Sequence, residues 1–166
     1  MTLNIEGKKS IVAEVAGVAR RATSAVAAEY RGMTVAEMTQ LRVNARKVGV
    51  YMRVVRNTLA RRAVADTDFA CLQEALVGPL VLAFSQEEPS AAPRVLTDFA
   101  KDHKTLVIKA GAFNGKLMKP AELEALAKMP TRNQAISMLM AVMKAPVGKL
   151  VRTLAAVRDQ KQAQAA

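Results

Sequence analysis

The fold is decided by a strand-to-helix stretch in the first half of the chain, VYMRVV at residues 50–55 followed by RNTLARRAVA at residues 56–65. The first run is rich in β-branched and aromatic residues and predicts a strand. Asn57 is a good N-cap, so we expect a helix from Thr58 to Ala65. A strand that passes directly into a helix is typical of α/β domains.

The same alternation extends in both directions from this stretch. Residues 3–22 form an amphipathic pattern, since Ile11, Val15 and Val18 recur at helical spacing, and residues 24–30 predict a short strand. Thr34 and Glu37 predict a capping box on a helix that ends at Gly49. Downstream, the patterns predict strands at residues 80–84 and 106–113 and helices at residues 94–101 and 120–126. We therefore expect an α/β fold over residues 1–130, a mixed sheet with packed helices.

Residues 131–166 are a different kind of segment, without any strand signal. Thr131 is a candidate helix cap, and apolar residues then recur at spacings of four and three, a heptad pattern. Pro146 and Gly148 predict a kink in this helix. The fold is thus followed by an extended C-terminal α-helical tail. Its apolar stripe consists of Ile136, Met140, Met143, Val147, Leu150, Leu154 and Val157.

Charge is distributed unevenly along the chain, whose formal net charge is +11. Residues 1–62 carry twelve Lys and Arg against four acidic residues, and residues 131–166 carry six against one. Residues 63–130 are close to neutral. Such a surface attracts nucleic acid, anionic membrane or acidic proteins, and two basic ends predict two separate anionic partners.

The segment from Met38 to Ala65 contains no Asp or Glu, yet it holds seven Arg and Lys residues. Arginine dominates, and its planar fork suits phosphate oxygens. Arg56 lies at a strand-to-helix junction, where free backbone N–H groups favour a phosphate, and Arg31-Gly32 occupies another such turn. We expect recognition of folded RNA by shape, through these residues: Lys8, Lys9, Arg31, Gly32, Arg46, Lys47, Arg53, Arg56, Asn57, Thr58, Arg61 and Arg62.

Catalytic, metal and cofactor sites find little support in the sequence. His103 is the only histidine and lies in a polar segment predicted to be exposed, and Gly7-Lys8-Lys9-Ser10 lacks the upstream glycine of a phosphate-binding loop. Cys71 is the only cysteine, which excludes an internal disulfide and favours a small core side chain. We expect no catalytic residue, no metal and no cofactor.

The exposed stripe of the tail needs a partner, and three alternatives stand. The helix could dock in a groove of acidic proteins, lie on a membrane surface, or pack within the fold. Docking to protein is favoured, because the tail has no Trp or Phe for interfacial anchoring. No segment reaches the length of uncharged apolar sequence that a transmembrane helix needs.

Several stretches resemble the bacterial family of large ribosomal subunit protein ten, the base of the lateral stalk. The resemblance rests mainly on GVYMRVVRNTL at residues 49–59 and GKLVRTLAAVR at residues 148–158, and it covers essentially the whole chain. It implies a cytoplasmic ribosomal protein that binds large-subunit ribosomal RNA beside ribosomal protein eleven. It also implies a C-terminal helix that gathers acidic stalk protein dimers, which recruit translational GTPases.

Carried over to this chain, the resemblance implies that stalk proteins bind Ile136, Leu139, Met140, Met143, Val147, Leu150, Leu154 and Val157. The short tail, with a joint at Pro146 to Gly148, predicts two dimers. No membrane partner is expected. The alternative is an RNA- or DNA-binding regulator whose tail self-associates, and the partner of the stripe distinguishes the two.

Overall fold

The structure is a computed structural model that describes residues 4–86, 88–103 and 105–165, and it divides into the compact units Met1–Met129 and Pro130–Ala166. The second unit contains a single helix, α6 (Arg132–Ala165). The elements of the first unit are, in chain order, α1 (Ile5–Ala19), β1 (Ser24–Glu29), α2 (Val35–Lys47), β2 (Val50–Val54), α3 (Asn57–Val64), the 3-10 helix η1 (Ala70–Gln73), β3 (Leu80–Ser85), α4 (Ala91–Asp102), β4 (Val107–Phe113), β5 (Lys116–Met118) and α5 (Pro120–Ala127).

The first unit is built on a five-stranded sheet of order β2-β3-β1-β4-β5. The predicted class, a sheet with packed helices followed by a helical tail, is confirmed. The expectation of a mixed sheet is corrected in one respect, because all the strand pairs described are antiparallel. β1 and β2 run in the same direction, but β3 lies between them and pairs with both, so no parallel pair forms.

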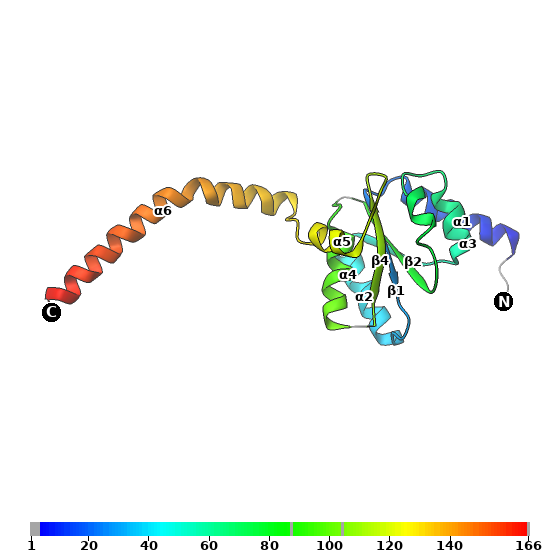
Figure 1. Ribbon diagram of the computed structural model, residues 1–166, viewed down its shortest axis with the longest axis horizontal. Helices are drawn as coiled ribbons and strands as arrows, with labels where there is room; N and C mark the ends of the chain where they lie inside the picture. The colour runs from blue at the N-terminus through cyan, green and yellow to red at the C-terminus, as the bar shows by residue number, and fades with distance from the viewer. Residues whose placement is uncertain (1–3, 87, 104, 166) are drawn as a thin grey trace. The chain divides into compact units, whose positions relative to one another are not determined.

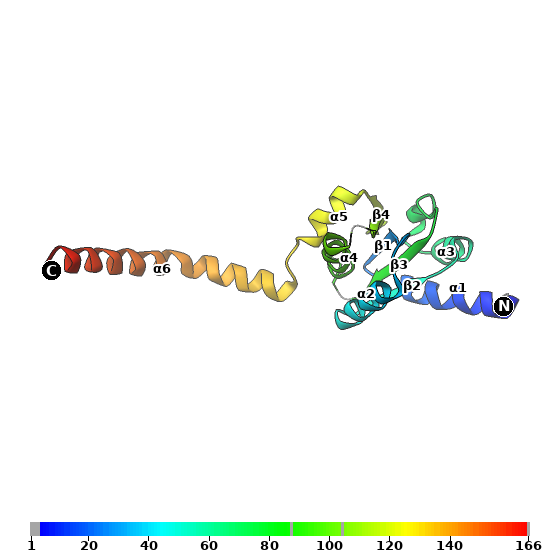
Figure 2. The ribbon, with the colours of Figure 1, turned by 90° about the horizontal axis from the view of Figure 1, so that it is seen from below.

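Helices cover both faces of the sheet (Figures 1 and 2). On one face α1, α3 and η1 pack over Ala25 and Ala27 of β1. On the other face α2, α4 and α5 pack over Val26 and Ala28 of the same strand. The alternation along β1 places successive side chains in different cores. Strands β1 and β3 are buried along nearly their whole length, which explains their continuous apolar sequences.

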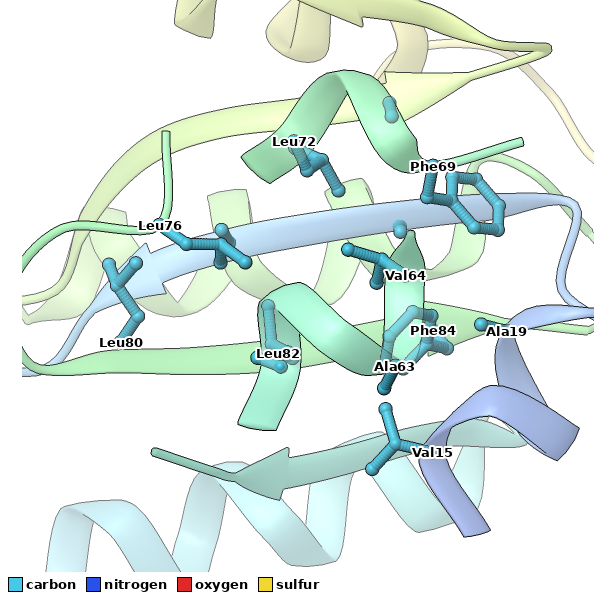
Figure 3. Close-up of a cluster of buried hydrophobic side chains, with 14 of the residues drawn as sticks. Val15, Ala19, Ala63, Val64, Phe69, Leu72, Leu76, Leu80, Leu82 and Phe84 are labelled. Atoms are coloured by element: carbon cyan, nitrogen blue, oxygen red, sulfur yellow. The ribbon is translucent and has the colours of Figure 1, made fainter. Parts of the chain in front are cut away.

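Aliphatic side chains and the rings of Phe69 and Phe84 fill the first core (Figure 3), and the partly buried Tyr51 packs against it. Phe84 of β3 lies between Phe69 and Tyr51, at ring-centroid distances of 6.3 Å and 6.5 Å. Cys71 packs partly buried against this core, and burial raises the pKa of its thiol. The second core includes Leu123 of α5, which lies directly over Gly111 of β4.

Local sequence signals explain most of the element boundaries. Thr34 and Glu37 form the predicted capping box, with the Thr34 N–H donating to Glu37 Oε2 at 2.8 Å. Pro120 begins α5 as expected, whereas α4 begins at Ala91 rather than Arg94. Pro93 therefore lies in the first turn of α4, where a missing N–H costs nothing.

Two further details differ from the sequence predictions. Arg56 rather than Asn57 is the N-cap of α3, and the Asn57 side chain instead donates to the Gly78 carbonyl at 2.9 Å. The short strand β5 was not predicted. It pairs with the end of β4 through the turn at Asn114 and Gly115, both with positive φ, which is the geometry that Asn-Gly favours.

In the second unit, α6 begins at the predicted cap. Thr131 and Gln134 bond reciprocally, since the Gln134 N–H donates to Thr131 Oγ1 and the Thr131 N–H donates to Gln134 Oε1. Pro146 lies inside the helix without ending it, and the helix curves along its length in Figure 1. Its 34 residues correspond to about 50 Å of helix.

Candidate nucleic-acid interface and partner-binding helix

Three loops meet at one end of the sheet. Glu29 at the end of β1 pairs with Leu80 at the start of β3, and Val54 at the end of β2 pairs with Val81. The turn after β1, the junction after β2 and the loop before β3 are therefore neighbours. A hydrogen bond of 3.3 Å from the Tyr30 N–H to the Pro79 carbonyl joins two of them.

This arrangement brings together several of the predicted RNA-binding residues. The turn after β1 contains Arg31 and Gly32, and Gly32 adopts a φ of 86° that favours glycine. Arg56 to Thr58 line an open surface hollow of about 520 Å³. Its other walls come from Tyr30 and from Gly78-Pro79, which the sequence analysis did not select. The Gly-Pro pair, a turn signal, could have indicated them.

Helix α3 continues this surface. It buries Leu59, Ala60, Ala63 and Val64, so Arg61 and Arg62 are left on its exposed side. Arg61 donates through Nη2 to the Leu76 carbonyl at 2.8 Å and thereby helps to hold the loop before β3. Asn57 holds the same loop through Gly78. Both side chains thus have a structural role in the free protein.

Three acidic residues of the basic half contact basic side chains from other elements. Glu14 pairs with Arg53 and Glu29 with Lys109 at 3.0 Å, while Glu37 lies 3.4 Å from the ring of His103. Within the described part of the chain, no carboxylate pairs with the exposed cations Arg31, Arg46, Lys47, Arg56, Arg61 and Arg62. These charges remain available to a polyanion.

Arg53 differs from the other predicted cations because the described structure shows it in an ion pair with a residue of the same chain. Its guanidinium contacts the Glu14 carboxylate of α1, and Nη1 also donates to the Tyr51 hydroxyl at 3.2 Å. The Tyr51 hydroxyl in turn donates to Glu14 at 2.8 Å. The hydrogen bonds from Tyr51 and Arg53 lower the pKa of Glu14, whereas burial raises the pKa of Tyr51.

The remaining predicted residues lie elsewhere. Arg46 and Lys47 are in the last turn of α2, followed by Val50, which pairs with Ser85 at the opposite end of the sheet. Lys8 and Lys9 are in the N-terminal half of α1. The predicted set therefore divides into a main group around α3 and the β1 turn, a second group at the end of α2, and the two lysines of α1.

His103 is not the exposed loop residue that was expected. Its ring stacks on Phe99 at a centroid distance of 4.3 Å, and its side chain is 28% exposed. It approaches Glu37, whose pKa is lowered first by its bond to the Thr34 backbone. Among the described residues, no group of His, Cys, Asp or Glu could hold a metal ion.

Helix α6 presents its apolar stripe to solvent. The seven residues of the stripe and Leu139, which together form the predicted stalk-protein-binding set, are between 47% and 72% exposed. By length and mean hydropathy alone, α6 could cross a membrane, although Lys144, Lys149 and Arg152 interrupt its apolar sequence as the sequence analysis expects. Length and mean hydropathy cannot distinguish a membrane from a protein partner, because helices of soluble proteins also reach these values.

Comparison with known proteins identifies the family. The family described as Ribosomal protein L10 matches residues 3–101, and the family described as Ribosomal protein uL10 C-terminal region matches residues 129–166. A large ribosomal subunit protein uL10 of Thioalkalivibrio sulfidiphilus is 64% identical over 99% of this chain and 100% of its own length. The proteins of that name from Nitrosococcus oceani and Aeromonas salmonicida are 60% and 58% identical, over 98% and 99% of this chain and 94% and 100% of their own lengths.

These matches define a structural protein of the large ribosomal subunit, a class that is not enzymatic. The chain belongs to the ribosomal protein L10, or uL10, family. The resemblance inferred from residues 49–59 and 148–158 is thereby confirmed. Family membership extends over both units, because the two matched regions lie in the sheet domain and in α6.

Proposed function

We propose that this protein forms the base of the lateral stalk of the large ribosomal subunit, in the cytoplasm. Its first unit binds large-subunit ribosomal RNA beside ribosomal protein eleven. Its helix α6 anchors two acidic stalk protein dimers, which recruit translational GTPases. The observation that carries the proposal is that each compact unit exposes a different surface. The first unit exposes arginines without an ion pair among the described residues, and the second exposes a stripe of apolar residues.

The RNA-binding half rests on Arg31, Arg56 and Arg62, which are exposed around the hollow and α3 and form no ion pair in the described residues. Each phosphate contact releases condensed counterions, so binding weakens with salt in proportion to the number of contacts. Phosphate contacts fix orientation and carry no base sequence, which fits recognition of folded RNA by shape.

The anchoring half rests on the pattern of α6. Its stripe occupies one side, whereas Lys149 and Arg152 lie on other sides of the same helix. A helix that spans lipid would be apolar all round, so this distribution favours a protein groove with acidic surroundings. The same reasoning supports a protein partner over a membrane.

One experiment tests the RNA-binding half. We expect Arg62→Gln to weaken binding of a large-subunit ribosomal RNA fragment and to reduce the salt slope by about 0.7–0.9. Lys101→Gln is the matched control, because Lys101 is on α4 and already pairs with Asp98 at 2.8 Å. If both variants have equal slopes, the main group around α3 is not the interface.

A second experiment tests the anchoring half by counting bound dimers with native mass spectrometry. We expect the full chain to bind two acidic dimers and the variant Leu150→Lys/Leu154→Lys to bind one. Thr153→Lys/Gln160→Lys adds the same charge away from the stripe and should keep both dimers. Equal loss in the two variants would reject the stripe as the binding surface.

The alternative is a nucleic-acid-binding regulator whose tail self-associates. It is favoured by the same exposed stripe, since two copies of α6 could cover one another. Sedimentation of the chain alone distinguishes the two functions. A concentration-dependent dimer that excludes acidic stalk protein would support the regulator.

A further inference from the structure

Arg53 is the one cation among the predicted RNA-binding residues that the described structure shows in an ion pair. Its partner Glu14 lies 39 positions earlier in the sequence, on α1. The pair is at the surface, because the side chains of Arg53 and Glu14 are 33% and 47% exposed. Surface pairs of this kind are weak and exchange readily for a stronger anion.

The geometry of the pair resembles the way a phosphate would be held. Glu14 accepts from Arg53 through Oε2 and from the Tyr51 hydroxyl through Oε1 at 2.8 Å. A phosphate offers the same kind of paired oxygens with more negative charge, and arginine–phosphate bonds are among the strong charge-assisted ones. Tyr51 and Arg53 are two positions apart on β2, so both side chains are on the same face of the strand. The two side chains could therefore contact one phosphate together.

We propose that Glu14 is an intramolecular substitute for an RNA phosphate, which masks Arg53 in the free protein and is displaced when RNA binds. The inference rests on the proposed RNA-binding function and adds a built-in competitor to it. Tyr51 is a positioning residue here, because it bonds to both the masking carboxylate and the masked guanidinium.

The alternative role for the pair is purely structural, in fastening α1 to the edge strand β2. The two roles predict opposite signs for the removal of the Glu14 charge. If Glu14 masks Arg53, Glu14→Gln strengthens RNA binding. If the pair only positions α1, Glu14→Gln weakens binding, since Lys8 and Lys9 on that helix lose their placement.

The test measures RNA binding by the full chain at a series of salt concentrations, with a large-subunit ribosomal RNA fragment as the probe. We expect Glu14→Gln to bind up to about fivefold more tightly than the wild type at low salt, the range expected for one surface ion pair. The salt slope should steepen by about 0.7–0.9, because Arg53 then releases a counterion rather than a carboxylate.

Glu6→Gln is the matched control, since it removes the same charge from the same helix at a residue without an ion pair in the described structure. It should change the slope by less than half as much. The double variant Glu14→Gln/Arg53→Met should lose the gain while thermal denaturation shows that it remains folded.

Each outcome decides the inference. A steeper slope in Glu14→Gln alone supports it. Equal effects of Glu14→Gln and Glu6→Gln, or weaker binding by Glu14→Gln, overturn the masking role while the proposed RNA-binding function stands on the wild-type result. A wild type that binds no ribosomal RNA overturns both.

Discussion

Gly111 of β4 is a position where one added methyl group should destabilise the sheet domain. A Cβ at this position would lie 2.5 Å and 3.0 Å from the two δ-carbons of Leu123 and 3.2 Å from the carbonyl oxygen of Ala25. Leu123 is only 1% exposed, so its side chain cannot swing into solvent. The Ala25 carbonyl belongs to the central strand, so the backbone cannot easily withdraw.

The size of the effect follows from two opposing contributions. Overpacking of a filled core typically costs about 1–3 kcal/mol, whereas replacing glycine by alanine gains about 0.5–1 kcal/mol by restricting the unfolded chain. We expect Gly111→Ala to lower the free energy of unfolding by about 1–2 kcal/mol. For a domain of this size, the corresponding decrease in Tm is about 3–10 °C.

Urea denaturation followed by circular dichroism measures this difference. Gly17→Ala is the matched control, because Gly17 is an exposed helical residue and, apart from its chain neighbours and the backbone of its own helix, nothing lies within 4 Å of the added Cβ. It should stabilise the protein slightly. In a double-mutant cycle, Leu123→Ala makes room for the added methyl group, so the two substitutions should be less damaging together than their sum. If Gly111→Ala is as stable as the wild type, or if the cycle is additive, the close approach does not exist.

Two further predictions concern the ion-pair cluster and the start of α6. Because Tyr51 and Arg53 lower the pKa of Glu14 in the folded protein, its contribution to stability is present above the unfolded pKa and is lost as pH falls through the folded value. Glu14→Gln should therefore flatten the decline in stability between neutral pH and about pH 3, as measured by urea denaturation, and an unchanged decline would exclude the cluster as its cause. Thr131→Ala should cost α6 about 1 kcal/mol and speed amide exchange of its first turn, since over residues 132–162 the helix has no buried side chain that compensates. Thr153→Ala, in mid-helix, should leave that exchange unchanged.

The two units of the chain expose different kinds of surface, which fits the two binding roles proposed for the stalk base. The sheet domain buries most of its large apolar side chains in two cores and exposes basic side chains on its surface. Helix α6 has no core of its own and exposes its apolar residues. Because an exposed apolar stripe favours association, we expect isolated preparations of the chain to self-associate.

Local sequence determined most of the elements of this protein. The capping residues Thr34 and Thr131, Pro120 at the start of α5 and the Asn114-Gly115 turn act within a few residues, so their effects could be predicted from spacing alone. The heptad stripe of α6 was equally visible, because it depends only on helical periodicity. The basic segment from Met38 to Ala65 indicated a polyanion partner because charge composition is a property of the chain.

Tertiary structure decided what the sequence left open, because these features join residues that are distant along the chain. The position of β3 between β1 and β2 makes the sheet antiparallel, and no local pattern determines strand order. Residues 38–65 contain no acidic residue, but the fold places Glu14 of α1 against Arg53. Arg53 therefore differs from the arginines that form no ion pair in the described residues. The same folding brings Arg31 and Arg56 to one end of the sheet and carries Arg46 and Lys47 to the other. Which side chains are buried and which lie close together is decided only when the strands pair. The number of charged residues could therefore be read from the sequence, but not which of them share a surface.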